Sequence, residues 1–294
     1  MGFYNSPRII LDDLVLNLDA GNTKSYVGDI ETPAGPAYGY IAGGAGNPTV
    51  SSVSRIDYSN DTPTATAKGP LSTLRRDHAG TGNASYGYMG GGSTYPGPPR
   101  VSTVDRIDYS SDTSTAAVKG PLSREDQKVS AVGNASYGYW AGGYPGGNVS
   151  TIDRLDFSSD TTTAAVKGPL SSHQQGLSAG TGTQSYGYIG GGDPARSTVD
   201  RIDYSNDTPT ASPKGPLTVE KKARGATGNS SYGYWSGGHP GSISTTDRLD
   251  YSSDTDTAVT KGPLSAGRYY LSATGSASYG WFAGGGYDAK STVD

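Results

Sequence analysis

The chain has 294 residues, a net charge of −4 and no cysteine, and it contains 45 glycines, 18 prolines and 22 tyrosines. The lack of cysteine excludes a disulfide framework and a thiolate zinc site. The weakly acidic balance, without a basic stripe, argues against nucleic acid and anionic membranes as partners, and no apolar run is long enough to predict a bilayer-spanning helix.

The N-terminal segment, residues 1–37, lies outside the repetitive part of the chain. It has no basic stretch followed by an apolar run, so it is not predicted to be a secretory signal. Leu14, Leu16 and Leu18 occupy alternate positions, which predicts one β-strand, and a turn follows at residues 20–22. We interpret residues 1–37 as a leader strand and linker, with the strand completing a neighbouring sheet.

From residue 38 onward a Tyr-Gly segment that ends in a glycine doublet recurs six times. Its first tyrosine stands at positions 38, 86, 137, 186, 232 and 279, so the spacings are 48, 51, 49, 46 and 47 residues. A period of this length is typical of solenoids, propellers and repeat arrays. The repeats therefore predict a single domain over residues 38–294.

One repeat contains signals for four short strands. In the second copy these are residues 86–92, 101–109, 115–119 and a segment near 128–132, and they are separated by turns rich in Ser, Asp, Gly and Pro. No helical periodicity interrupts them, so each repeat predicts a small antiparallel sheet. Six such sheets arranged around an axis predict an all-β fold, a six-bladed β-propeller of four-stranded blades.

The repeat resembles the kelch repeat over residues 38–294. That family has a strand ending in a glycine doublet, a strand with a spaced aromatic residue, and a strand that leads to a proline-containing loop. The doublets begin here at Gly43, Gly90, Gly142, Gly190, Gly237 and Gly284, and the aromatic residues are Tyr58, Tyr109, Phe157, Tyr204 and Tyr251. The chain departs from the kelch pattern because the tryptophan of the third strand is replaced by Ala-Val-Lys or a similar sequence.

Two features of the chain also resemble proteins of tailed bacteriophages. The segment 14–26 is similar to the opening of laminin-G/concanavalin-like modules of phage tail and structural proteins, and the Tyr-Gly-Tyr/Gly-Gly array resembles structural and tail-fibre proteins of marine phages. The resemblance implies a virion protein that is made in the host cytoplasm and becomes extracellular after release.

The end of the array is incomplete. There are six Tyr-Gly segments, but the Arg-Ile/Leu-Asp-aromatic strand and the Lys-Gly-Pro-Leu element each occur five times, and residues 291–294 only begin a sixth copy of that strand. Three explanations fit: the leader completes the last blade, the array is longer, or another subunit fills the open blade. We favour a closed ring because open edge strands promote aggregation.

The recurrent charged motif is Asp-Arg-Ile/Leu-Asp-aromatic. It could present rings of charge to a ligand, or its arginines could pair with aspartates across adjacent blades. We favour the structural pairing, because five equivalent copies do not suit one asymmetric active site. The predicted interblade residues are Arg55, Asp57, Arg106, Asp108, Arg154, Asp156, Arg201, Asp203, Arg248 and Asp250.

Neither a metal site nor a catalytic site is predicted. The turn aspartates faintly resemble the Asp-box of sialidases, but one Asp with Ser and Thr neighbours falls short of the roughly six to eight oxygens that calcium takes. The histidines, His78, His173 and His239, occupy no equivalent repeat positions and have no zinc-site spacing. We therefore expect no cofactor and no enzymatic activity.

Specific binding is expected in the variable loops, where Tyr95, Tyr144 and His239 are the candidate ligand contacts. The favoured function is a non-enzymatic virion structural or tail-fibre-associated protein that binds a host surface or another virion protein. A carbohydrate-binding adhesin or lectin is one alternative, and a filament-forming subunit that assembles by strand addition is the other. The expected partners are virion or assembly proteins, host glycans, or further copies of the chain.

Overall fold

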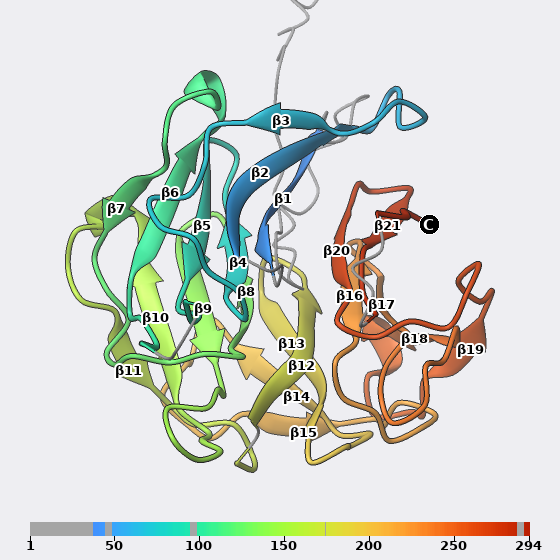
Figure 1. Ribbon diagram of the computed structural model, residues 1–294. Coiled ribbons are helices and arrows are strands. Elements are labelled where there is room, and N and C mark those ends of the chain that lie inside the picture. Colours follow the sequence, from blue (N-terminus) through green and yellow to red (C-terminus); the bar gives the residue numbers. More distant parts are fainter. Residues whose placement is uncertain (1–37, 45–48, 95–98, 174, 287–290) are drawn as a thin grey trace, which may run out of the picture.

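The computed structural model describes residues 38–44, 49–94, 99–173, 175–286 and 291–294. These residues form antiparallel sheets arranged around an axis, which is the architecture of a β-propeller (Figure 1). The predicted all-β class and the propeller arrangement are thus confirmed. The predicted leader strand lies outside the described residues.

Four sheets are four-stranded blades in which each strand pairs with the next along the chain. The first contains β4 (Ala79–Gly82), β5 (Tyr86–Gly90), β6 (Val104–Asp108) and β7 (Ala117–Lys119). The second contains β8 (Ser130–Gly133), β9 (Tyr137–Ala141), β10 (Ile152–Asp156) and β11 (Ala165–Lys167). The third contains β12 (Gln175–Gly182), β13 (Tyr186–Asp193), β14 (Val199–Asp203) and β15 (Ser212–Lys214). The fourth contains β16 (Gly225–Gly228), β17 (Tyr232–Ser236), β18 (Thr246–Asp250) and β19 (Val259–Lys261).

The prediction of six four-stranded blades was wrong. The described residues form five blades, because the sheet β1 (Tyr38–Gly44), β2 (Val50–Asp57) and β3 (Thr66–Lys68) has three strands, and the last repeat adds only the two-stranded sheet β20 (Ser272–Gly275) and β21 (Gly280–Ala283). The physical reason is that the last repeat lacks a described partner for most of the outer edge of β21. Only a short bridge between Ala283 and Val293 begins a third strand there.

The strand signals located the elements within a few residues. In the second repeat the predicted strands at 115–119 and 128–132 form as Ala117–Lys119 and Ser130–Gly133. The turn predicted between the strands at 101–109 and 115–119 begins as a single 3-10 turn, η1 (Tyr109–Ser111), and η2 (Phe157–Ser159) and η3 (Tyr251–Ser253) are its equivalents. Among the described residues, no helix is long and apolar enough to cross a membrane.

The ring closes between the first blade and the β20–β21 sheet. Strand β1 contacts β20, and these two elements lie side by side in Figure 1. The ring of Tyr58 stacks on Trp281 with centroids 4.1 Å apart, and Trp281 Nε1 donates a hydrogen bond of 2.8 Å to Asp61. These contacts join the two ends of the ring through described residues.

The innermost strands consist of small residues because they pack closely around the axis. Strand β4 reads Ala-Gly-Thr-Gly, and all four residues are buried. Contacts run from β4 to β8, then to β12, β16 and β20. Larger side chains at these positions would separate neighbouring blades.

The hydrophobic core lies between the faces of adjacent blades. One cluster joins Tyr88 and Leu122 to Trp140 and Leu155 of the next blade, and the indole of Trp140 donates a 3.0 Å hydrogen bond to the carbonyl of Ala79. The same arrangement recurs at Trp235, which donates to the carbonyl of Ala179 at 2.9 Å. Since each sheet is too small to bury a core alone, blade stacking provides the apolar burial.

The glycines that end the second strand of each four-stranded blade include pairs with backbone angles that other residues rarely adopt. Gly142 and Gly143 have φ values of 68° and 113°. A Cβ on Gly143 would also collide with the carboxylate of Asp126. Glycine is therefore required there both by the conformation of the turn and by the close approach of a side chain.

Candidate functional site

The recurrent charged motif divides its residues among several structural roles. In the blade β8–β11, Asp153 accepts a hydrogen bond of 3.0 Å from the backbone N–H of Ser123, which lies in the Gly-Pro-Leu-Ser element of the preceding repeat. The arginine, the apolar residue and the aromatic residue of the motif lie at junctions with neighbouring blades, and its second aspartate lies in the turn that follows.

Four of the five motif arginines contribute to a four-residue cluster between blades, which we call the interblade latch. Arg106 Nη1 and the hydroxyl of Tyr88 donate hydrogen bonds of 2.7 and 3.0 Å to one carboxylate oxygen of Asp160 in the next blade. Lys119 Nζ lies 3.2 Å from the other oxygen. The Asp160 side chain is only 8% exposed, so three donors compensate for the burial of its charge.

The latch recurs at four junctions. The turn aspartate is in each case the residue that follows the Ser-Ser or Ser-Asn pair, and the three donors come from the preceding blade. The four latches are Asp112 with Tyr40, Arg55 and Lys68; Asp160 with Tyr88, Arg106 and Lys119; Asp207 with Tyr139, Arg154 and Lys167; and Asp254 with Tyr188, Arg201 and Lys214.

The structure therefore pairs four of the five predicted arginines across blades, but with a different aspartate from the one in their own motif. The fifth, Arg248, lies over the ring of Tyr232 and has no carboxylate partner among the described residues. Asp108, the second aspartate of the motif, instead accepts hydrogen bonds from the backbone N–H and the hydroxyl of Ser110 at 2.9 and 2.7 Å, and so caps the 3-10 turn. Asp57, Asp156, Asp203 and Asp250 bond to the serine two residues later in the same way. The sequence did not distinguish the two kinds of aspartate, because every repeat carries both and the partner of Arg106 lies 54 positions away in the next repeat.

Backbone hydrogen bonds and ring stacking complete each junction. Gly120 N–H donates to the carbonyl of Asp160 at 2.7 Å, and Ala164 N–H donates to the carbonyl of Pro121 at 2.8 Å. The ring of Tyr88 stacks on Phe157 with centroids 4.4 Å apart. Arg106 also lies 4.2 Å above the ring of Tyr86, so the guanidinium group is held by an aromatic face as well as by the carboxylate.

The latches predict a loss of stability in acid. Burial raises the pKa of Asp112, Asp160 and Asp254, but hydrogen bonds from tyrosine and lysine and the arginine charge outweigh it, so each pKa lies below its usual value. A lowered folded-state pKa contributes stability above the unfolded-state value of about 3.9 and loses it as the pH falls through the folded value. We expect the free energy of unfolding, measured by urea denaturation, to decrease as the pH is lowered below about 4.

Asp126 provides the control for this experiment because its contribution has the opposite sign. Burial raises its pKa to about 6, although Arg124 opposes the shift. Because the folded-state pKa is raised, Asp126 costs stability as the pH rises from about 4 to 6. Asp126→Asn should therefore change the free energy of unfolding between about pH 4 and 6 and leave the loss of stability below about pH 4 unchanged. If stability still fell in the same way below about pH 4 after the latch aspartates were replaced by asparagine, the latches would not be its cause.

A second set of equivalent positions lies at one end of the inner strands, and we call these the mouth positions. They are Asp77, Lys128, Leu177, Ala223 and Tyr270, and all have φ between 57° and 66°. Their backbones are linked around the ring: Lys128 N–H donates to the carbonyl of Asp77 at 2.6 Å, and Tyr270 N–H donates to that of Ala223 at 2.8 Å. The hydrogen bonds account for a conformation that non-glycine residues seldom adopt.

Two of the three predicted loop contacts are located by the structure. Tyr144 is half-buried beside the mouth, with Arg100 and Lys128 at 5.7 and 5.4 Å from its ring centroid. His239 is partly buried against Tyr269, with ring centroids 5.4 Å apart. Tyr95 lies outside the described residues. The sequence contained no signal for the mouth positions, because their shared backbone conformation is visible only in three dimensions.

The structure does not gather the histidines into a site. His78 is buried, and burial together with the nearby charge of Arg75 lowers its pKa to about 3, so the imidazole is neutral at physiological pH. Within the described ranges, no group of three or more histidine and acidic side chains is placed to hold a metal ion.

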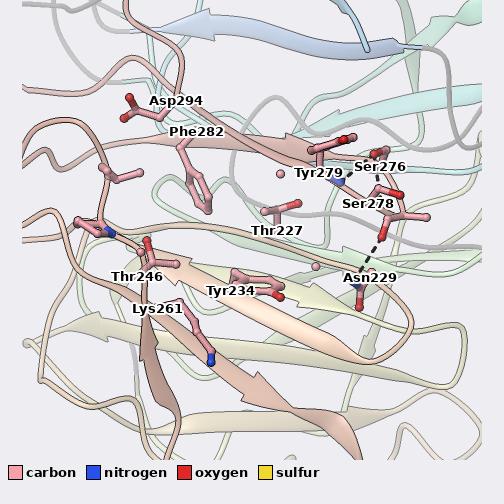
Figure 2. Close-up of a pocket in the computed structure, with 16 residues that line it drawn as sticks. Thr227, Asn229, Tyr234, Thr246, Lys261, Ser276, Ser278, Tyr279, Phe282 and Asp294 are labelled. Atoms are coloured by element: carbon pink, nitrogen blue, oxygen red, sulfur yellow. Dashed lines mark hydrogen bonds between the residues drawn. The ribbon is translucent and has the colours of Figure 1, made fainter. Parts of the chain in front are cut away.

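One junction of the ring carries latch donors, but no latch aspartate lies there among the described residues. A groove of about 410 Å³ lies between the blade β16–β19 and the β20–β21 sheet, and we call it the terminal groove. Figure 2 shows Tyr234, Thr246 and Lys261 on one side of it, and Phe282 and Asp294 on the other. Tyr234 and Lys261 are equivalent in sequence to Tyr188 and Lys214 of a complete latch.

Comparisons with known proteins identify no family for the chain: no family model matches it, and no curated protein matches its sequence. The fold alone defines the class of the protein, which is a β-propeller. Its candidate sites are the mouth positions and the terminal groove.

Proposed function

We propose that the protein is a non-enzymatic attachment scaffold, which binds a host surface or another virion protein through the mouth positions and the loops around them. The mechanism is binding on a rigid ring, without a covalent step. The proposal is also based on the resemblance of the repeats to kelch arrays and to structural and tail-fibre proteins of tailed phages.

The single observation that supports this function best is the contrast between latch and mouth. The latch keeps the same residue types at four junctions, as expected of a structural device. The mouth positions share one backbone conformation but carry five different side chains, two charged and three apolar. Leu177 and Ala223 are buried, so Asp77, Lys128 and Tyr270 are the mouth positions that vary the exposed surface. A constant backbone with different exposed side chains makes an asymmetric surface, which is what specific recognition of one ligand needs.

The surroundings of the mouth add groups that suit a polar ligand with apolar faces. Tyr270 is 49% exposed, and Tyr144 presents an aromatic ring flanked by two cations. Aromatic rings stack on the apolar faces of sugars, and cations bind acidic groups. These features favour an acidic glycan of a cell surface as the ligand, which is the lectin form of the same attachment function.

The test is binding of the full-length chain to a glycan array and to whole bacterial cells. We expect Tyr144→Ala and Tyr270→Ala each to weaken binding about tenfold or more, since a stacked aromatic contact contributes about 1 to 2 kcal/mol. Val166→Ala is the control, because Val166 is 59% exposed on the outer strand β11. Equal binding by all three variants, or binding by none of the probes, would contradict the mouth as the attachment site.

A further inference from the structure

We propose that the mouth recognises a glycan with an acidic group at one end only, and that Arg100 and Lys128 select for that group. The acidic group, a carboxylate or a sulfate, lies beside Tyr144, while an uncharged sugar lies on Tyr270. This inference rests on the proposed attachment function and specifies the ligand of that same site.

Two cations converge on the ring of Tyr144. Arg100 Cζ lies 5.7 Å from the ring centroid, and Lys128 Nζ lies 5.4 Å from it. They come from different blades, since Arg100 precedes β6 and Lys128 precedes β8, the innermost strand of the next blade. All three side chains are partly exposed, so an acidic group at the edge of the tyrosine ring can reach both cations from solvent.

These two cations have no carboxylate partner of their own. Neither Arg100 nor Lys128 forms an ion pair with another described residue, although each lies over the tyrosine ring. Arg100 Nε is also buried without a hydrogen-bond partner among those residues. Since charged donors form the strongest hydrogen bonds with ionised acceptors, this pair is suited to a carboxylate or sulfate of a ligand.

The acids on this side of the mouth do not balance the cations. Asp77 lies 3.8 Å from Arg76, and burial raises the pKa of Asp77 although nearby positive charges, that of Arg76 first, oppose the shift. Arg124 is paired with Asp126 at 3.0 Å. The cations remain in excess even when the exposed Glu125 is counted. This side of the mouth therefore favours a negatively charged group.

The cations on the side of Tyr270 already have partners within the chain. They are Lys222 with the carboxylate of Asp193 at 3.0 Å, Lys221 with the carbonyl of Pro240 at 2.6 Å, and Arg196 with the buried Asp200, whose pKa its charge lowers against the effect of burial. Tyr270 itself is 49% exposed and lies 5.3 Å from the ring of Tyr269. An exposed aromatic ring beside compensated charges suits the apolar face of a neutral sugar.

The two sides belong to one continuous surface. Tyr144 begins the loop 144–148, and Asn148 Nδ2 at its end donates a 3.0 Å hydrogen bond to the carbonyl of Asp193, the partner of Lys222. Tyr144 and Tyr270 thus lie at different parts of the same rim. A ligand that contacts both needs more than one sugar ring, with its charge at the Tyr144 end.

A uniformly charged polymer, such as a nucleic acid or a highly sulfated polysaccharide, fits this surface less well. Such a ligand needs unpaired cations along its whole path, because neutralisation of its charges supplies most of the affinity. The cations without a carboxylate partner are instead confined to the side of Tyr144. The net charge of −4 also opposes the approach of a polyanion.

The experiment uses the full-length chain and an array in which each acidic glycan, carboxylated or sulfated, is paired with its neutral parent. Titration calorimetry then measures the dissociation constants of the best pair. We expect the acidic member to bind about tenfold or more tightly than its parent, because it gains charge-assisted hydrogen bonds. Arg100→Gln and Lys128→Gln should each remove most of this preference, while the unchanged affinity for the neutral parent shows that the variants are folded. Tyr270→Ala should weaken both members equally.

Lys222→Gln is the matched control, since it removes one charge from a cation that is already paired with Asp193. The preference for the acidic member should persist in this variant. Equal binding of the two members, or an equal loss of preference in Lys222→Gln and Arg100→Gln, overturns the inference but leaves attachment at the mouth intact. Tighter binding of heparin or single-stranded DNA than of any singly charged glycan identifies a polyanion instead. Failure of every glycan to bind overturns the proposed function as well.

Discussion

Replacing Asp160 by alanine is expected to lower the free energy of unfolding by about 3 kcal/mol. The substitution removes the acceptor shared by Tyr88, Arg106 and Lys119, and it leaves two cations in a partly buried site. The loss is smaller than for a fully buried pair because Arg106 remains 24% exposed and water can partly solvate it. Chemical denaturation followed by tyrosine and tryptophan fluorescence measures the change.

The control for this prediction is Asp156→Ala, in the motif that directly precedes the turn of Asp160. Asp156 is partly exposed and caps η2 by accepting hydrogen bonds from Ser158, so its loss should cost about 1 kcal/mol. Equal effects of the two substitutions would show that the latch adds nothing beyond a turn cap. A double-mutant cycle of Asp160 with Arg106 would then measure how much of the effect belongs to that pair.

Replacing Gly168 by alanine is expected to destabilise the ring by about 3 kcal/mol or more, because the new Cβ would overlap the carbonyl of Pro209 in the next blade. Backbone atoms cannot rotate away as a side chain can, so the two blades would have to separate. The same overlap recurs at the other three latched junctions.

Gly262→Ala is the matched control, since the same substitution at the equivalent position of the terminal groove meets no atom within 4 Å. We expect its melting temperature to stay within a few degrees of the unmodified chain, or to rise slightly because alanine restricts the unfolded state. A similar loss of stability from both substitutions would mean that the glycines are needed for their backbone conformation rather than for close contact between blades.

The two pairs of variants test one idea, that the ring is held by a repeated contact between the third strand and turn of one blade and the face of the preceding blade. Trp281 shows how the contact adapts at the closing junction. Its indole both stacks on Tyr58 and donates to Asp61, so one side chain fulfils the stacking and hydrogen-bonding roles of the usual tyrosine. Neither an arginine nor a lysine reaches Asp61 in the described residues.

Much of the fold could be predicted from the chain alone because its signals are local. The alternation of Tyr88 with glycine, the Ser-Asp turn after Tyr109 and the Gly-Pro stop after Lys119 each act within a few residues, and they placed strands close to where they form. Copying of those signals at a period of 46 to 51 residues also predicted the propeller.

The candidate site was less accessible to sequence reasoning because its contacts join residues far apart in the chain. Arg106 and Asp160 are 54 positions apart, and no local pattern distinguishes Asp160 from Asp108 as the partner. The mouth positions were missed for a similar reason: Lys128 and Tyr270 share a backbone conformation and a place around the axis, but not a residue type.

By itself, the sequence determined the all-β class, the repeat length and the approximate positions of the strands, since these depend on periodic apolar, aromatic and turn-forming residues. Only the tertiary structure decided the number of complete blades, which aspartate each arginine binds, and how the ring closes through Trp281. Those features depend on which copies of the repeat become neighbours around the axis, and a repeating sequence leaves that choice to the geometry of packing.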